Sequence, residues 1–140
     1  MSRVLFQLLI TVICSLFAVS VATAAGRVLT PKQLEMVESA RKSEKYAAHP
    51  EWALTVDEAV ADLLSRLPSE KREAIKGMKS EELPGLHHSL GRHIRNRYGL
   101  WRGNVFLHVS CESVIDGEFD ADRCSTVIIE ALWLELNKGS

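Results

Sequence analysis

The amino-acid sequence predicts an all-α fold, a small bundle of four to five helices with one disulfide. Apolar residues recur at helical spacing in several segments, and single Pro and Gly residues separate these segments. No pair of alternating apolar stretches suggests a sheet. The chain of 140 residues with 46% hydrophobic residues fits one globular domain.

The first segment, residues 1–24, predicts a secretory signal peptide. Arg3 precedes a long apolar stretch, which ends in the small residues Ala22-Thr23-Ala24. We expect cleavage after Ala24 and an exported protein, either periplasmic or secreted. The alternative is an uncleaved anchor, because residues 4–21 are almost long enough to span a bilayer. Only in that case do we expect membrane attachment.

The predicted export determines how the cysteines are interpreted. Cys14 leaves with the signal peptide, so the mature chain keeps only Cys111 and Cys124. In an oxidising compartment such a pair predicts one disulfide. A free or metal-bound pair is the alternative.

Residues 25–49 predict a polar helix or a tether. Thr30 and Gln33 form a capping box around Pro31, which suits the first position of a helix. Few apolar residues follow, so this helix would be marginal in isolation. Residues 50–140 are expected to form the helical domain.

A second helix is predicted to begin at a capping box formed by Thr55 and Glu58 and to end before Pro68. Its apolar residues lie on one helical face. Ser69 is expected to cap a short third helix.

A fourth helix is predicted from Leu83 to Tyr98, with one apolar stripe. Gly91 lies beside that stripe and indicates close approach by another element, and Gly99 suits a left-handed C-cap. The following Leu100-Trp101 pair is expected to fill the core.

The last third of the chain contains three segments. Residues 105–111 fit either a strand or a short helix that begins at Asn104. Residues 116–122 predict an acidic loop. Residues 124–136 predict a final apolar helix.

The overall charge is close to neutral, with 17 basic and 18 acidic residues, which argues against a dedicated nucleic-acid binder. Basic residues are concentrated between Glu82 and Glu112, an interval without any acid, and acidic residues follow. One interpretation is internal pairing of the basic helix with the acidic loop. The other is a face that binds a phosphate, an anionic glycan or a partner's carboxylates. The binding candidates on that face are His87, Arg92, Arg95 and Asn96.

Catalytic and metal motifs are weak. The histidines lack the i, i+4 spacing of a helical metal site, and no nucleophile elbow, phosphate-binding loop or dinucleotide fingerprint is present. We expect no metal and no cofactor. A hydrolase would need a base beside its reacting groups, and the one set available is His87 as base, Asp122 or Asp120 beside it, and Arg95 as anion clamp.

The run from Leu86 to Trp101 resembles the core of a bacterial domain-of-unknown-function family with the pattern H-x-x-x-G-x-x-I-R-N-x-aromatic-G-L-W. The similarity extends upstream to the helix start at Thr55 and downstream to the helix that contains Trp133. It covers roughly residues 50–136. The resemblance implies no established activity and therefore supports a domain boundary without adding a mechanism.

The function expected from these observations is non-enzymatic binding of a protein partner in the cell envelope. An inhibitor or immunity-type role would fit by analogy of size and location alone. The alternatives are a hydrolase acting on a phosphoester or glycan through His87 and Arg95, and a membrane-tethered scaffold if the signal is retained.

Overall fold

The computed structural model describes residues 29–139, and the predicted signal peptide of residues 1–24 lies outside this range. The all-α class is confirmed, and Cys111 and Cys124 form a disulfide.

Two short helices, α2 (Pro31–Arg41) and α3 (Glu44–Ala47), precede α4 (Val56–Arg66) and α5 (Ser69–Lys76). The 3-10 segment η1 (Ser80–Leu86), the π-helical segment η2 (His87–Gly91) and α6 (Arg92–Arg97) follow. The remaining elements are η3 (Leu100–Arg102), α7 (Val105–Ser110), β1 (Val114–Ile115), β2 (Glu118–Phe119) and α8 (Ala121–Leu136).

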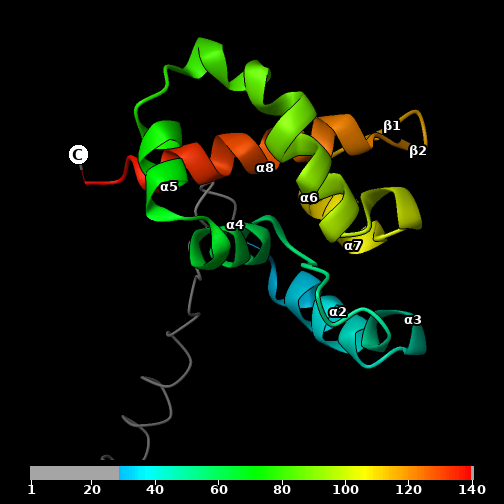
Figure 1. Ribbon diagram of the computed structural model, residues 1–140. Coiled ribbons are helices and arrows are strands. Elements are labelled where there is room, and N and C mark those ends of the chain that lie inside the picture. The colour runs from blue at the N-terminus through cyan, green and yellow to red at the C-terminus, as the bar shows by residue number, and fades with distance from the viewer. Residues whose placement is uncertain (1–28, 140) are drawn as a thin grey trace, which may run out of the picture.

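The long helix α8 forms the centre of the main core (Figure 1). It packs against α4, α5, α6 and the η segments. Ile128 and Leu132 of α8 are completely buried beside Leu63 of α4 and Ile94 of α6. Each such side chain contributes about 1.5–3 kcal/mol by leaving water, so this core is the main source of stability.

A second, smaller core attaches α2 and α3 to the rest of the chain. Trp52 and Leu54 are buried there, and Tyr46 packs edge-on against Trp52 and Phe106, with ring centroids 5.9 and 5.4 Å apart. The polar segment predicted as a helix or tether is therefore helical from Pro31 and packed on α7. None of the helices within residues 29–139 is long and apolar enough to cross a membrane.

The predicted helix starts are largely confirmed. Thr30 forms its capping box with Gln33. Thr55 caps α4 by accepting from the Glu58 backbone N–H, but the Glu58 carboxylate accepts from the N–H of Leu54 instead of that of the cap residue. The prediction for Ser69 was wrong, because Pro68 occupies the N-cap position of α5.

The segment predicted as one helix from Leu83 to Tyr98 is helical as far as Arg97 but changes type twice, from 3-10 to π to α. These changes account for part of the excess of helical segments over the expected number, and the short elements α3, η3 and α7 account for the rest. Gly91 ends the π segment, where an added Cβ atom would lie 3.0 Å from Arg95 Nη1 and 3.6 Å from Ser125 Oγ of α8. The approach by another element inferred at Gly91 is therefore found only as an ordinary contact with the Ser125 side chain, and the tightest neighbour is the Arg95 side chain.

The turn after α6 contains the main error in the predicted core. Gly99 has the left-handed conformation expected of it, with φ of 67°, and the Trp52 side chain lies where a Cβ atom would point. Leu100 is buried as expected, but Trp101 is 60% exposed. The two neighbours point in different directions within a 3-10 turn, so only one of them can face the core.

The ambiguous segment after Asn104 is helical, because the Asn104 side chain accepts from the Leu107 N–H and caps α7. The acidic segment predicted as a loop contains a small antiparallel hairpin, in which Val114 pairs with Phe119 and residue 115 with residue 118. Its two-residue turn is Asp116-Gly117, with positive φ at both positions.

Candidate functional site

Arg95 lies at the centre of the residues singled out from the sequence. Its side chain is only 4% exposed. Nη1 donates to Ser125 Oγ at 2.8 Å and lies 3.2 Å from Asp122 Oδ1, while Nη2 donates to the carbonyl of His87 at 3.2 Å. The guanidinium therefore joins α6 to η2 and to the first turns of α8.

Arg95 follows a change of helix type, from the π-helical segment η2 to α6. The intervening π-helical turn adds residues to one turn of helix and rotates everything downstream relative to an unbroken α-helix. A purely α-helical projection from His87 therefore misplaces Arg95.

His87 and Asp122, the other members of the alternative catalytic set, are also brought to Arg95. His87 Nε2 lies 3.8 Å from Asp122 Oδ1. The Asp122 side chain is 63% exposed, so solvent reaches this carboxylate even though its partner Arg95 is buried. Asp120, the other acid considered, instead caps α8 by accepting from the Arg123 N–H at 2.9 Å.

Ser125 completes this cluster and was missed in the sequence. It is completely buried, and its hydroxyl donates to the Asp122 carbonyl at 2.9 Å while accepting from Arg95. Its position three residues after Asp122 on one helix face is the signal that would have identified it. This hydroxyl is buried, and its hydrogen is donated to a backbone carbonyl, so in this arrangement it serves to hold Arg95.

Arg92 and Asn96, the remaining binding candidates, do not join Arg95. Both are exposed on α6. The carbonyl of Asn96 accepts from Arg102 at 2.9 Å, which helps to fix the turn after the helix. The four candidates therefore do not form a single anion-binding face, because Arg95 is committed to internal partners.

A cleft of about 510 Å³ lies next to this cluster, between Trp101, the hairpin and the start of α8. Its apolar lining consists mainly of exposed side chains, Trp101, Ile115 and Phe119. Its polar lining consists of four carboxylates, Asp116, Glu118, Asp120 and Asp122. The Arg95 guanidinium carbon lies 5.2 Å from the centre of the Trp101 ring, which places a cation–π contact under one wall of the cleft.

The disulfide and His108 attach the hairpin side of the cleft to α7 and α8. The Cys111–Cys124 disulfide joins the end of α7 to α8 and encloses the hairpin. The buried His108 ring hydrogen-bonds through Nδ1 with Ser113 Oγ at 2.8 Å and donates from Nε2 to the Leu100 carbonyl at 3.0 Å. The same ring stacks on Phe119 with centroids 4.9 Å apart. Neither His108 nor Ser113 was recognised from the sequence as part of this wall.

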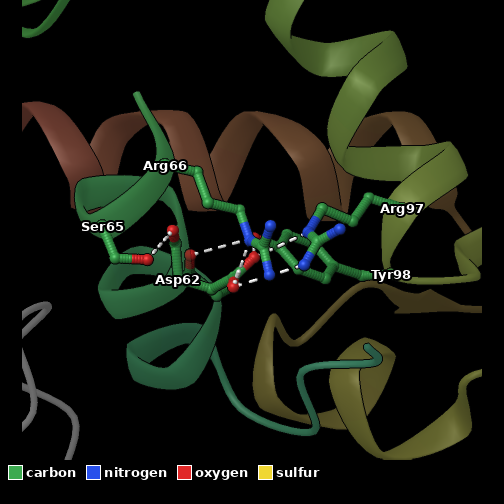
Figure 2. A network of polar contacts seen from close by, with 6 residues as sticks. Asp62, Ser65, Arg66, Arg97 and Tyr98 are labelled. Atoms are coloured by element: carbon green, nitrogen blue, oxygen red, sulfur yellow. Dashed lines mark hydrogen bonds and ion pairs between the residues drawn. The ribbon is translucent and has the colours of Figure 1, made fainter. Parts of the chain in front are cut away.

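A separate polar network joins α4 to α6 on another part of the surface (Figure 2). Asp62 accepts from Arg97 Nε at 2.6 Å, from Arg66 Nε at 2.7 Å and from the Tyr98 hydroxyl at 3.0 Å. Partial burial disfavours the charged carboxylate, but the hydrogen bonds from Arg97, Arg66 and Tyr98 outweigh it and lower the pKa of Asp62 to about 2. Burial and the Asp62 charge raise the pKa of Tyr98. These side chains hydrogen-bond to one another, which indicates a structural role.

Residues 29–139 contain no group of three or more His, Cys, Asp or Glu side chains arranged to hold a metal ion. The carboxylates that line the cleft belong to the hairpin and to the start of α8.

Comparison with known proteins gives a family without an assigned activity. The family model of DUF6794, a domain of unknown function, matches residues 54–136. The match begins one residue before the N-cap of α4 and ends with α8, so it includes the cleft, the disulfide and the Asp62 network. No curated protein and no solved structure matches the chain.

Proposed function

This chain belongs to the family of the domain of unknown function DUF6794, and on that premise we propose that it is an exported, non-enzymatic binding protein of the cell envelope. Its interaction surface is the cleft between Trp101 and the hairpin. This surface replaces the anion-binding face expected on α6, since Arg95 is buried and paired.

The observation that carries the proposal is the exposure of three large apolar side chains around one cleft. Trp101 of η3, Ile115 of β1 and Phe119 of β2 all line the same hollow. Exposed apolar residues with a polar rim are typical of sites where a partner binds. Tryptophan in particular is enriched among the residues that contribute most to binding energy.

The hairpin suits binding because it is fixed before any partner arrives. The disulfide, the His108–Ser113 hydrogen bond and the stacking of His108 on Phe119 all hold it against α7 and α8. A preformed surface loses less conformational entropy on association than a loop that must order.

The cell envelope as location rests on the N-terminal segment and is supported by the cysteine pair. An apolar segment ending in Ala22-Thr23-Ala24 is typical of a secretory signal, and a structural disulfide persists in oxidising compartments. An inhibitor or immunity protein directed against an enzyme of the envelope is one form that such a binding protein would take.

The test is co-purification of the tagged mature protein from envelope fractions. Trp101→Ala removes the largest wall of the cleft, and Leu134→Ala is the matched control, because Leu134 is also an exposed apolar residue but does not line the cleft. We expect one stoichiometric partner with the wild type and the control, and its loss with Trp101→Ala. Recovery of the partner with all three folded proteins, or with none, would contradict the proposal.

A hydrolase acting on a phosphoester or glycan is the second candidate, because His87, Arg95 and Asp122 do converge. Binding is favoured over this reaction since the Arg95 guanidinium is occupied and the nearby hydroxyl of Ser125 is buried. Turnover of p-nitrophenyl phosphate or a p-nitrophenyl glycoside by the wild type, abolished by His87→Ala in a folded protein, would reverse this preference.

A further inference from the structure

Resting on the proposed function, we propose that the cleft binds a basic segment of a partner protein. A Lys or Arg side chain of that segment enters between Trp101 and the hairpin, and flanking apolar side chains contact Ile115 and Phe119. The basic residues of the sequence predicted an anionic ligand, so this proposal gives the ligand the opposite charge.

Charge is the first argument. The residues that line the cleft include four carboxylates and no Lys, Arg or His side chain. Arg95 offsets part of one of these charges, through its contact of 3.2 Å with Asp122. Arg123 is exposed on the next residue of α8, but its side chain does not line the hollow. The cleft is therefore complementary to a cation.

The carboxylates at the tip of the hairpin are the ones left available to a partner. Asp122 already contacts Arg95, and Asp120 caps α8. Asp116 and Glu118 are exposed on the hairpin itself. A cation entering the cleft would therefore meet these two side chains first.

The aromatic wall is the second argument, independent of the acidic residues. Tryptophan is the best aromatic acceptor for a Lys or Arg cation within about 6 Å of the ring. The Trp101 ring already contacts one guanidinium, that of Arg95 at 5.2 Å, and still leaves 60% of the residue exposed. A partner's cation would use the exposed part of the same ring.

The apolar lining distinguishes a protein segment from a small cation. A metal ion would not use Ile115 and Phe119, and the described residues include no group of three or more side chains suited to hold one. The hollow of about 510 Å³ is open to solvent and accommodates more than one side chain. A peptide that alternates basic and apolar residues uses both the carboxylates and the apolar wall.

The probes are two blocked hexapeptides, acetyl-Ala-Leu-Arg-Leu-Arg-Ala-amide and its counterpart with Glu in place of Arg. Each is titrated into the mature, oxidised, 15N-labelled protein up to about 5 mM, a range suited to weak single-segment binding. We expect the Arg peptide to shift the Trp101 indole N–H signal and the amides of residues 115–119. Added salt should weaken this binding, since exposed charges are screened.

The carboxylates are tested by Asp116→Asn and Glu118→Gln, with Glu130→Gln of α8 as the matched control. Each cleft variant should weaken binding of the Arg peptide by up to about fivefold, the range for an exposed ion pair, and the control should leave it unchanged. Equal binding of the Glu peptide, shifts that map elsewhere, or no shift with the Arg peptide would overturn the proposal.

The failure of this inference can be distinguished from failure of the binding function. If an envelope partner depends on Trp101 but is insensitive to salt and to both hairpin carboxylate variants, the binding function stands and the basic segment is wrong. If the Arg peptide binds in the cleft while no envelope partner is captured, the chemistry of the cleft stands and the envelope role fails.

Discussion

The Asp62 network gives the sharpest stability prediction, because its charge, partners and burial are all specified. Asp62 on α4 accepts from Arg97, Arg66 and the Tyr98 hydroxyl (Figure 2). Burial opposes ionisation, yet these hydrogen bonds lower the pKa of the carboxyl from 3.8 to about 2. A difference of this size corresponds to at most about 2.4 kcal/mol of folding free energy at neutral pH.

The expected contribution is smaller, because 26% of the Asp62 side chain is exposed and solvent screens the ion pairs. We expect about 1–2 kcal/mol. Because the pKa is lower in the folded than in the unfolded state, the stabilisation is fully present above pH 3.8 and is lost as the pH falls towards 2.

The perturbation is Asp62→Asn, which keeps the shape of the side chain and removes its charge. The free energy of unfolding is measured by urea titration of wild type and variant between about pH 6 and about pH 2.5. The difference should be about 1–2 kcal/mol at the upper end and should shrink towards the lower end, where the wild-type carboxyl is becoming protonated. Glu130→Gln, an exposed carboxylate on α8, is the control for a general effect of charge.

A difference between wild type and Asp62→Asn that stays constant over this pH range would refute the reasoning. It would mean that the lost stability came from shape or hydrogen bonding alone. A difference that grows as the pH falls would refute the sign as well.

Three further predictions concern stability. Cys111→Ser should lower the free energy of unfolding by roughly 3 kcal/mol, since the disulfide closes a short loop in the unfolded chain; equal melting temperatures with and without reductant would contradict this. Gly99→Ala should lower the free energy of unfolding, measured by urea titration, by about 2–4 kcal/mol, through both its positive φ and a clash with the Trp52 indole. Gly117→Ala should lower it by only about 1 kcal/mol, because its φ is positive but its surroundings are open. Similar costs for the two glycines would argue against the clash. Arg95→Met should lower the free energy of unfolding by about 2–3 kcal/mol through lost hydrogen bonds to a charged group, and a thermal melt unchanged from wild type would contradict that.

The sequence predicted the elements whose signals are local. Caps at Thr30 and Thr55 and the left-handed Gly99 depend on a few neighbouring residues, and each is found where expected. The hairpin was missed although Asp116-Gly117 is a strong two-residue turn signal, because the flanking strands are too short to show alternation.

The candidate site was predicted less well, because its geometry depends on contacts between distant segments. The proximity of His87, Arg95 and Asp122 was anticipated from the opposite charges of the two regions. The burial of Arg95 was not, since a π-helical turn changes the helical phase without an evident mark in the sequence. Trp101 was assigned to the core by its hydrophobicity alone, which does not determine the direction of a side chain in a turn.

These errors bear on how binding should be tested. Arg95 is a natural first choice for mutation, since it is the most central basic residue of α6, but it holds η2 and α8 together beneath the Trp101 wall. Loss of binding in an Arg95 variant would therefore report a disturbed cleft, whatever the charge of the ligand. Glu118 is exposed on the hairpin and lines the cleft, so its neutralisation changes what a ligand meets without removing a support of the fold. A neutral variant of Glu118 therefore tests the sign of the ligand's charge, whereas a variant of Arg95 tests the stability of the cleft.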